Sequence, residues 1–244
     1  KQLLTLLIIG EINKDYYLIM SYPLVIKDNF FPDPDSIVKL SKKIVYCVNQ
    51  KIYPGVRSQC LSEVNNKLYL YIGSKIFSLL HDKFPTYYSM KIAFHKTSPI
   101  VKGDKWDKKN LGWVHKDACL FGGVIYMDKN PDKDAGTGIY KSKYGYDVQT
   151  RESMDCKEKL FSGEQIDDIE YYNAYDIVHD QYEETLRIPN VYNRLVLIPG
   201  DQMHMMTTIG EKERNHIVFF CNEVTGICPP EFKMHTFSFP NDKL

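Results

Sequence analysis

A histidine and an aspartate lie two residues apart at the start of an apolar run, in the stretch GWVHKDACLFGGVIYMD (Gly112–Asp128). If this stretch is extended, successive side chains alternate between its faces, so His115 and Asp117 point the same way. Two polar side chains that face the edge of a core are costly unless a partner satisfies them. A metal ion is one candidate for that partner.

A second segment, LVLIPGDQMHMMTTIGEKERNHIVFF (residues 195–220), offers a further ligand and a cation. It places His204 near the start of one predicted strand and Arg214 before the next strand. Two histidines and one carboxylate form the facial triad that holds non-haem Fe(II) and leaves positions open for substrate and oxygen. Two ligands from one strand, with the third from a distant strand that folds back beside it, would build such a site.

We expect these residues to be positioned by a mainly β domain. From Met90 onward, apolar runs of strand length are separated by turn signals, and about eight such strands favour an antiparallel barrel or jelly roll. The charged, tyrosine-rich segment 143–191 interrupts them, and we expect it to form a helical or irregular insertion over one mouth of the barrel. The predicted strands are MKIAF, GWVHKDA, FGGVIYM, GTGIYKS, RLVLIPG, HMMTTI, HIVFFCN and HTFSF.

Residues 20–90 predict a lobe of strand and helix that packs against this core. SYPLVIKDNFF alternates like a strand, PDPDSIVKLSKKIVYCV begins with helix start signals, and NNKLYLYIGSKIFSLLHDKF has helical spacing. We therefore expect an α+β, mainly β fold with a single domain over residues 20–244, in which residues 90–240 form the core. We expect residues 1–19 to be an extension that function does not require, and we disfavour a signal peptide there.

The composition is that of an ordinary globular protein, with 43% hydrophobic and 25% charged residues among 244 and a formal net charge of zero. It shows no electrostatic footprint for nucleic acid and no apolar run long enough to span a membrane, so we expect neither partner. The six cysteines form no C-x-x-C pair. Free thiols, and with them a cytoplasmic location, are therefore favoured over a disulfide framework or zinc ribbon.

The order of the motifs resembles the Fe(II)/2-oxoglutarate-dependent dioxygenase superfamily, and the prolyl-hydroxylase-like branch looks most similar. The resemblance covers residues 90–222 and thus the predicted barrel. KDNFFPDPDSI and YPGVR are similar, more weakly, to a functionally uncharacterised group in that superfamily, and they indicate no substrate. The motifs that carry the resemblance are His115–Asp117, Tyr126-Met127-Asp128, Gly136-Thr137-Gly138, His204 and Arg214-Asn215-His216.

The resemblance implies a double-stranded β-helix (jelly-roll, cupin-like) core and an Fe(II) site at His115, Asp117 and His204. It also implies 2-oxoglutarate and O2 as co-substrates, with ascorbate as a further candidate. The implied reaction is hydroxylation of a protein side chain or a small molecule, with release of succinate and CO2. Halogenating relatives carry a small residue at the position of Asp117, so its carboxylate favours hydroxylation.

Three more roles follow from the resemblance. Arg214 would pair with the distal carboxylate of 2-oxoglutarate, which suits its planar guanidinium. Tyr126 would bring its hydroxyl to the same carboxylate. His216 stands where relatives commonly carry serine or threonine, and is either a second co-substrate contact or a departure from the pattern.

Two other functions stay open: a cupin-like binding protein without turnover, and a hydrolase that uses the same ligands for zinc-activated water. Arg214 argues against the hydrolase, because hydrolysis needs no dicarboxylate anchor. A competing interpretation treats His204 as a packed strand histidine and Arg214 as a turn residue. The sequence does not decide between a peptide and a small-molecule substrate, and it does not determine the oligomeric state.

Several other polar and aromatic residues are expected to be structural. His81 and His179, each followed by an aspartate, are expected to be solvated, and His95 to cover the core. Arg57 in YPGVRS is also expected to be structural, and Trp113 either walls the pocket or packs. The tyrosines of the insertion are expected to form a helix face packed on the barrel, and they are Tyr171, Tyr172, Tyr175 and Tyr182.

Overall fold

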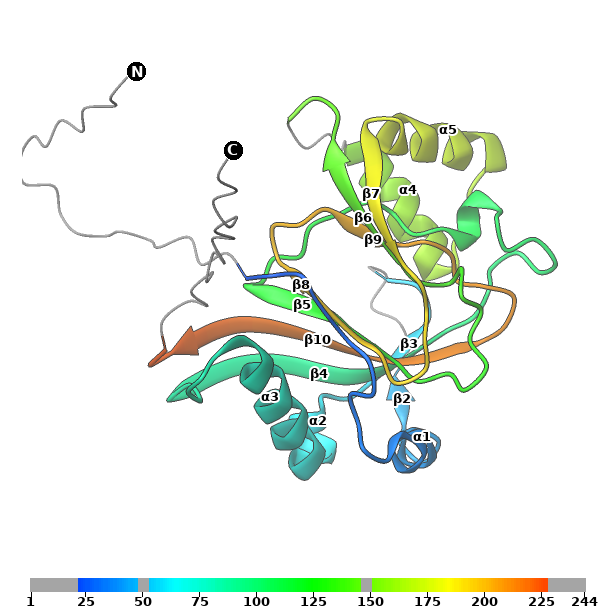
Figure 1. The fold of residues 1–244 in the computed structure, drawn as a ribbon. Coiled ribbons are helices and arrows are strands. Elements are labelled where there is room, and N and C mark those ends of the chain that lie inside the picture. Colours follow the sequence, from blue (N-terminus) through cyan, green and yellow to red (C-terminus); the bar gives the residue numbers. More distant parts are fainter. Residues whose placement is uncertain (1–21, 48–52, 146–150, 228–244) are drawn as a thin grey trace, which may run out of the picture.

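The computed structural model describes residues 22–47, 53–145 and 151–227, and these ranges form two antiparallel sheets with helices outside them (Figure 1). The large sheet has seven strands in the order β1-β8-β5-β10-β4-β3-β2, and the small sheet has three in the order β7-β6-β9. The strands are β1 (Val25–Lys27), β2 (Tyr46–Cys47), β3 (Val56–Ser58), β4 (Tyr87–Thr97), β5 (Phe121–Tyr126), β6 (Thr137–Ser142), β7 (Tyr182–Ile188), β8 (Leu195–Pro199), β9 (His204–Met206) and β10 (Arg214–Thr225). The expected mainly β, antiparallel architecture is confirmed at this level.

The helices lie on the outer sides of the two sheets. Helices α1 (Pro34–Ser41), α2 (Leu61–Val64) and α3 (Asn66–Leu80) lie along the large sheet, while α4 (Arg151–Ser162) and α5 (Asp168–His179) lie beside the small one (Figure 1). No helix in the described part of the chain is long and apolar enough to cross a membrane.

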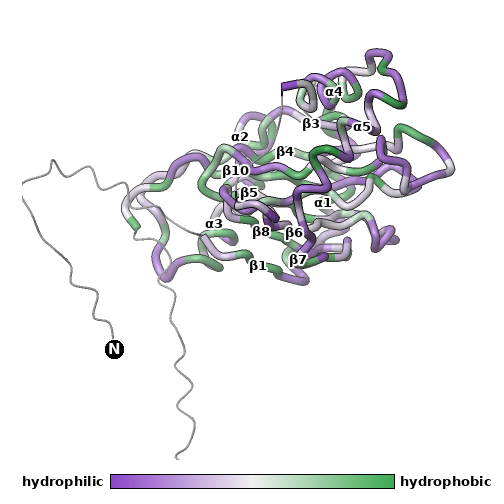
Figure 2. The backbone as a smooth tube through the Cα atoms, turned by 90° about the horizontal axis from the view of Figure 1, so that it is seen from above, coloured by the Kyte–Doolittle hydropathy of each residue, from purple (hydrophilic) through white to green (hydrophobic). Residues whose placement is uncertain are grey.

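The main hydrophobic core lies between α3 and the large sheet. Asn65 precedes helix α3, and its side chain accepts a hydrogen bond from the Leu68 amide and so caps the first turn. The buried face of α3 includes Ile72 and Ile76, and it belongs to the same apolar cluster as Phe219 of β10. Figure 2 shows the hydrophobic residues concentrated along the central strands. The helix predicted from NNKLYLYIGSKIFSLLHDKF is confirmed.

The segment expected to form an N-terminal lobe contributes strands to the large sheet. Strand β1 pairs with β8 at one edge, and β3 pairs with β4 toward the other edge. The helix predicted from PDPDSIVKLSKKIVYCV is shorter than expected, because α1 ends at Ser41 and the chain continues into β2. The strands of this segment are therefore part of the large sheet, and its helices lie along that sheet.

The insertion 143–191, expected to be helical or irregular, contains the helices α4 and α5, but its last part is a strand. Tyr182–Ile188 forms β7, which pairs with β6 in the small sheet. The expectation of a helical or irregular segment is wrong there. Glu183 and Glu184 are poor strand formers, and hydrogen bonding to β6 overrides their local preference.

Two other predicted strands are shorter than expected. GWVHKDA contains only an isolated bridge, which pairs His115 with His204, and HMMTTI forms a strand only over His204–Met206. The predicted strand HTFSF lies outside the described residues. The cysteines that the structure describes are free thiols, as expected.

Candidate active site

The structure brings together His115, Asp117 and His204, the three residues predicted to bind a metal. Their ligand atoms lie within 4.8 Å of one another. The His115 Nε2 atom is 3.7 Å from Asp117 Oδ1, and the His204 Nε2 atom is 3.5 Å from Asp117 Oδ2. Two imidazole nitrogens and a carboxylate that converge in this way match the donor set of a facial triad.

Backbone hydrogen bonds place the three residues. His115 and His204 each donate an amide hydrogen bond to the other's carbonyl oxygen, with both N–O distances at 3.0 Å. The Asp117 amide donates to the carbonyl of Gly200, also at 3.0 Å. Gly112 runs so close to the neighbouring chain that a Cβ there would lie 2.4 Å from the Met206 carbonyl oxygen. The pairing therefore depends on a bare backbone at Gly112.

Each histidine turns its Nε2 atom toward Asp117. The Nδ1 atom of His115 is 2.7 Å from the Trp113 carbonyl oxygen, and that of His204 is 2.8 Å from the Gln202 carbonyl oxygen. A carbonyl only accepts, so each Nδ1 carries the proton and each Nε2 presents a lone pair. This second hydrogen bond is the one that orients metal-binding histidines.

The electrostatics keep the donor atoms in the form that binds metal. Burial lowers the pKa of His115 to about 3, and the neighbouring His204 adds to the effect, so the imidazole is neutral at pH 7. Burial by itself raises the pKa of Asp117, but the neighbouring His204 and His115 and the charge of Arg57 together outweigh burial and lower the pKa below its usual range. The residues present therefore fit a divalent cation.

Arg214 lies at the start of β10 with its side chain buried. One Nη1–H donates to the Thr208 carbonyl oxygen at 2.9 Å. Its Nε–H has no partner among the described residues, and no carboxylate there forms an ion pair with the guanidinium. Burial is the main cause that lowers the pKa of Arg214. A buried cation without an anion is costly, so the side chain is poised for an anionic ligand.

Tyr126 and His216 lie near Arg214. The Tyr126 hydroxyl is 2.7 Å from Thr137 Oγ1, and its ring centroid is 6.0 Å from Arg214 Cζ. His216 contacts His95, with Nε2 of the former 3.0 Å from Nδ1 of the latter. His216 Nδ1 is buried and has no hydrogen-bond partner in the described part of the chain.

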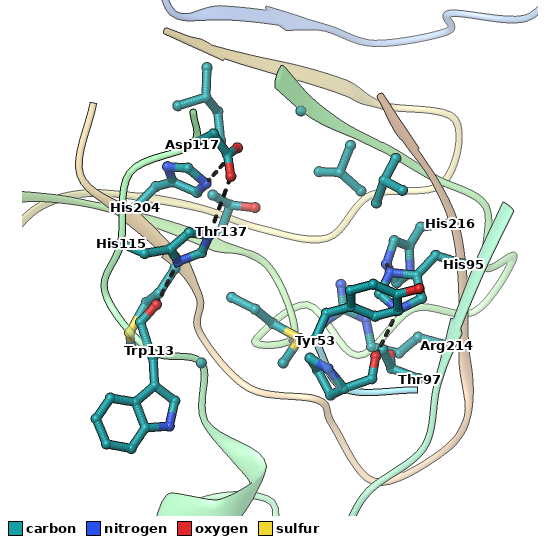
Figure 3. A pocket seen from close by; sticks show the side chains of 18 of the residues that line it. Tyr53, His95, Thr97, Trp113, His115, Asp117, Thr137, His204, Arg214 and His216 are labelled. Atoms are coloured by element: carbon teal, nitrogen blue, oxygen red, sulfur yellow. Dashed lines mark hydrogen bonds and ion pairs between the residues drawn. The ribbon is translucent and has the colours of Figure 1, made fainter. Parts of the chain in front are cut away.

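One cavity of about 400 Å³ connects these groups. Figure 3 shows the candidate metal ligands on one side, and Arg214, His216 and His95 on the other. The size is within the range of small-molecule sites. All six residues singled out in the sequence line this cavity, and they are His115, Asp117, His204, Arg214, Tyr126 and His216.

The cavity also contains residues whose position the sequence did not predict. Arg57 and His95, both expected to be structural, line it together with Lys157 of α4. Register explains the first two, because Arg57 pairs with His95 and His95 pairs with His216. The YPGVR motif singled out Arg57 in the sequence, but no local pattern predicts which strand β3 pairs with.

Helix α5 packs against Trp113 and carries three of the four tyrosines expected on a helix face, whereas Tyr182 begins strand β7 instead. The Trp113 Nε1–H donates to the Tyr171 hydroxyl at 2.9 Å, and Tyr175 is also buried. The expectation that His179 is solvated is wrong, because its ring stacks on Tyr175 at a centroid distance of 3.6 Å. Burial lowers the pKa of His179 to about 4. His81 is likewise packed, against Phe77.

Solved structures of similar fold include two that were determined with 2-oxoglutarate bound. HygX from Streptomyces hygroscopicus, with nickel, 2-oxoglutarate and hygromycin B bound, aligns with a TM-score of 0.52 at 10% identity over 87% of each chain. EvdO2 from Micromonospora carbonacea var. aurantiaca, complexed with 2-oxoglutarate, aligns with a TM-score of 0.51 at 10% identity over 92% of this chain and 96% of EvdO2. A prolyl hydroxylase from Trichoplax adhaerens has a TM-score of 0.48 at 12% identity, over 82% of this chain and 83% of that one. The two structures with TM-scores above 0.5 confirm that this chain resembles, in fold, proteins that bind 2-oxoglutarate.

Residues 13–214 match a family of unknown function, DUF6445, and the chain belongs to that family. No curated protein matches the sequence.

Proposed function

We propose that this protein is an Fe(II)- and 2-oxoglutarate-dependent dioxygenase that hydroxylates a small molecule or a protein side chain. One observation carries the proposal: two histidines and a carboxylate converge at one wall of a cavity whose other wall holds a buried, unpaired arginine. A zinc hydrolase would use the triad but would leave Arg214 without a role.

In this proposal His115, Asp117 and His204 hold the iron through the two Nε2 atoms and the carboxylate. The Nδ1 hydrogen bonds to backbone carbonyls fix the ring planes, so the donors need no rearrangement. With iron, 2-oxoglutarate and O2 bound, the centre would supply the oxidant for hydroxylation and release succinate and CO2.

Arg214 would bind the distal carboxylate of 2-oxoglutarate through its guanidinium. Tyr126 would border that carboxylate, with its hydroxyl oriented by Thr137. Aliphatic side chains of the large sheet line the same cavity and would exclude water from the reacting atoms, namely Val124, Ile198 and Val218.

We also propose that the two sheets form a double-stranded β-helix core and that residues 20–244 act as one domain. The antiparallel sheets with the cavity between them support the first part. A shared apolar cluster that joins Phe30 and Ile72 to Phe94 and Phe219 supports the second.

Anaerobic absorption spectroscopy of the full chain with Fe(II), titrated with 2-oxoglutarate, tests the function. We expect a weak visible charge-transfer band that grows with 2-oxoglutarate and is absent in His115→Ala. His81→Asn, a histidine substitution away from the cavity, should keep the band. Intact, iron-loaded wild-type protein without a band would refute the dioxygenase.

A further inference from the structure

The cavity carries more positive charge than the proposed reaction needs. Among the described residues that line it, Asp117 is the one carboxylate, whereas Arg57, Lys157 and Arg214 are cationic. Asp117 is a candidate metal ligand and Arg214 a candidate 2-oxoglutarate ligand. Arg57 and Lys157 have no assigned role.

The guanidinium of Arg57 lies against two aromatic rings, yet its buried Nε has no hydrogen-bond partner among the described residues. Its guanidinium lies over the Tyr53 ring, with Cζ 3.6 Å from the centroid, and 5.3 Å from the Phe220 centroid. Aromatic faces fix the plane of a guanidinium and leave its N–H edges available. In the described part of the chain its Nε has no hydrogen-bond partner and no carboxylate forms an ion pair with it. Burial lowers the pKa of Arg57 to about 10, so it stays charged at pH 7.

Lys157 approaches the same cavity from α4. It lies on the helix next to the buried Cys156, whereas Lys159 points outward and contacts Glu170 at 3.8 Å. No ion pair of Lys157 is found among the residues that the structure describes. Burial lowers the pKa of Lys157, and the charge of Asp117 opposes that effect. The ammonium is thus partly desolvated without a dedicated anion.

The charges in the cavity, counted on the basis of the proposed function, leave two cations without an anion. Fe(II) carries two positive charges, Asp117 one negative, 2-oxoglutarate two negative and Arg214 one positive, so this set is neutral. Arg57 and Lys157 then remain uncompensated in a partly desolvated cavity. Such charges are costly unless an anion joins them, and the primary substrate is the molecule that has yet to bind.

We propose that the primary substrate is a small organic anion, whose carboxylate or phosphate group is bound by Arg57 with Lys157 as the second cation. The planar guanidinium of Arg57 can donate two parallel N–H hydrogen bonds to either group. Binding at this end would hold the carbon skeleton in the cavity that the candidate metal ligands line. Arg57 is thus a specificity-determining residue, distinct from the co-substrate anchor Arg214.

The test measures thermal unfolding of full-length protein loaded with Ni(II) and 2-oxoglutarate, in the presence of acetate, inorganic phosphate or neutral acetamide. We expect one or both anions to raise the unfolding midpoint at constant ionic strength, and acetamide to leave it unchanged. Their relative effects distinguish a carboxylate substrate from a phosphate ester. Arg57→Gln and Lys157→Gln should each weaken anion binding about tenfold or more, whereas Lys159→Gln on the outer face of α4 should not.

A second arm separates this inference from the proposed function. The metal-free Arg214→Gln variant lacks the co-substrate anchor, and inorganic phosphate should still stabilise it through Arg57. Binding that survives here supports the anion site even if no iron band appears. If Arg57→Gln does not fold, Lys157→Gln decides. Unchanged anion binding in the folded variants would overturn the inference and leave the dioxygenase intact.

Discussion

His216 lies 3.0 Å from His95, and the direction of this hydrogen bond is set by a third group. The His95 Nε2 atom is 2.7 Å from the carbonyl oxygen of Pro54, which only accepts. His95 therefore carries its proton on Nε2 and accepts from His216 through Nδ1. His216 is left with a lone pair on Nδ1, where relatives with serine or threonine offer a hydroxyl donor. This geometry favours a departure from the family pattern over a second donor to the co-substrate carboxylate.

The histidine pair should contribute to stability. His95→Leu leaves the buried Nε2–H of His216 without an acceptor, and we expect a loss of about 1–3 kcal/mol in the free energy of unfolding. His95→Leu combined with His216→Phe removes both polar partners and should cost less than the two single changes together. Urea denaturation of all four proteins forms a double-mutant cycle, and strict additivity would contradict the hydrogen bond.

Metal binding should stabilise the folded state. Ni(II) binds the native triad and not the separated ligands of the unfolded chain, so a hundredfold excess over Kd should add about 2.7 kcal/mol. Thermal unfolding with and without Ni(II) measures this, and a chelator should reverse it. His204→Ala should abolish the shift, while His179→Gln should retain it. Full stabilisation of His204→Ala would place the metal elsewhere.

Loss of the Arg214 guanidinium should weaken 2-oxoglutarate binding by about a hundredfold, since a charge-assisted bidentate pair is lost. Arg214→Gln should keep metal affinity, because Arg214 is not among the triad ligands. Calorimetric titration of the Ni(II)-loaded variant with 2-oxoglutarate measures the first effect, and titration with Ni(II) the second. Unchanged co-substrate affinity would reject the assignment.

Stability should fall as the pH drops below about 6.5. Burial lowers the pKa of His95 to about 3, helped by the charges of Arg57 and Arg214, and the pKa of His179 to about 4. Between these values and 6.5 the unfolded chain binds protons that the folded protein excludes, which favours unfolding. In that window each histidine lowers the free energy of unfolding by up to about 1.4 kcal/mol for each pH unit of acidification. Above about pH 6.5 neither histidine changes the free energy of unfolding.

Urea denaturation across this pH range measures the dependence. His179→Gln removes one titrating group, so its stability should fall less steeply with acid than that of the wild type. An identical slope in both proteins would show that His179 does not keep its depressed pKa.

The sequence predicted that the three triad residues converge, because the evidence lies in short-range patterns and in the motif spacing shared with the superfamily that the chain resembles. His115 and Asp117 share a face by alternation, and the distance from His204 to Arg214 matches the resemblance. The structure puts all of them at one cavity.

The sequence could not reveal contacts that depend on how distant elements pair. Arg57 reaches the cavity only because β3 joins β4, and nothing near YPGVR specifies that partner. His179 is packed because α5 covers Trp113, which an isolated His-Asp pair does not indicate. Strand β7 was missed because its acidic residues oppose the pairing that tertiary structure imposes.

The reciprocal backbone hydrogen bonds between His115 and His204 also determine when the complete triad can form. The two residues are distant along the chain, and β9 follows nearly all other strands. A ribosome-bound chain that has emerged only as far as the small-sheet strand β7 holds two of the three donors and lacks the third. If the triad binds iron as proposed, the complete metal site therefore forms only after His204 has been synthesised and has paired with His115, and a chain that ends before β9 lacks the third donor.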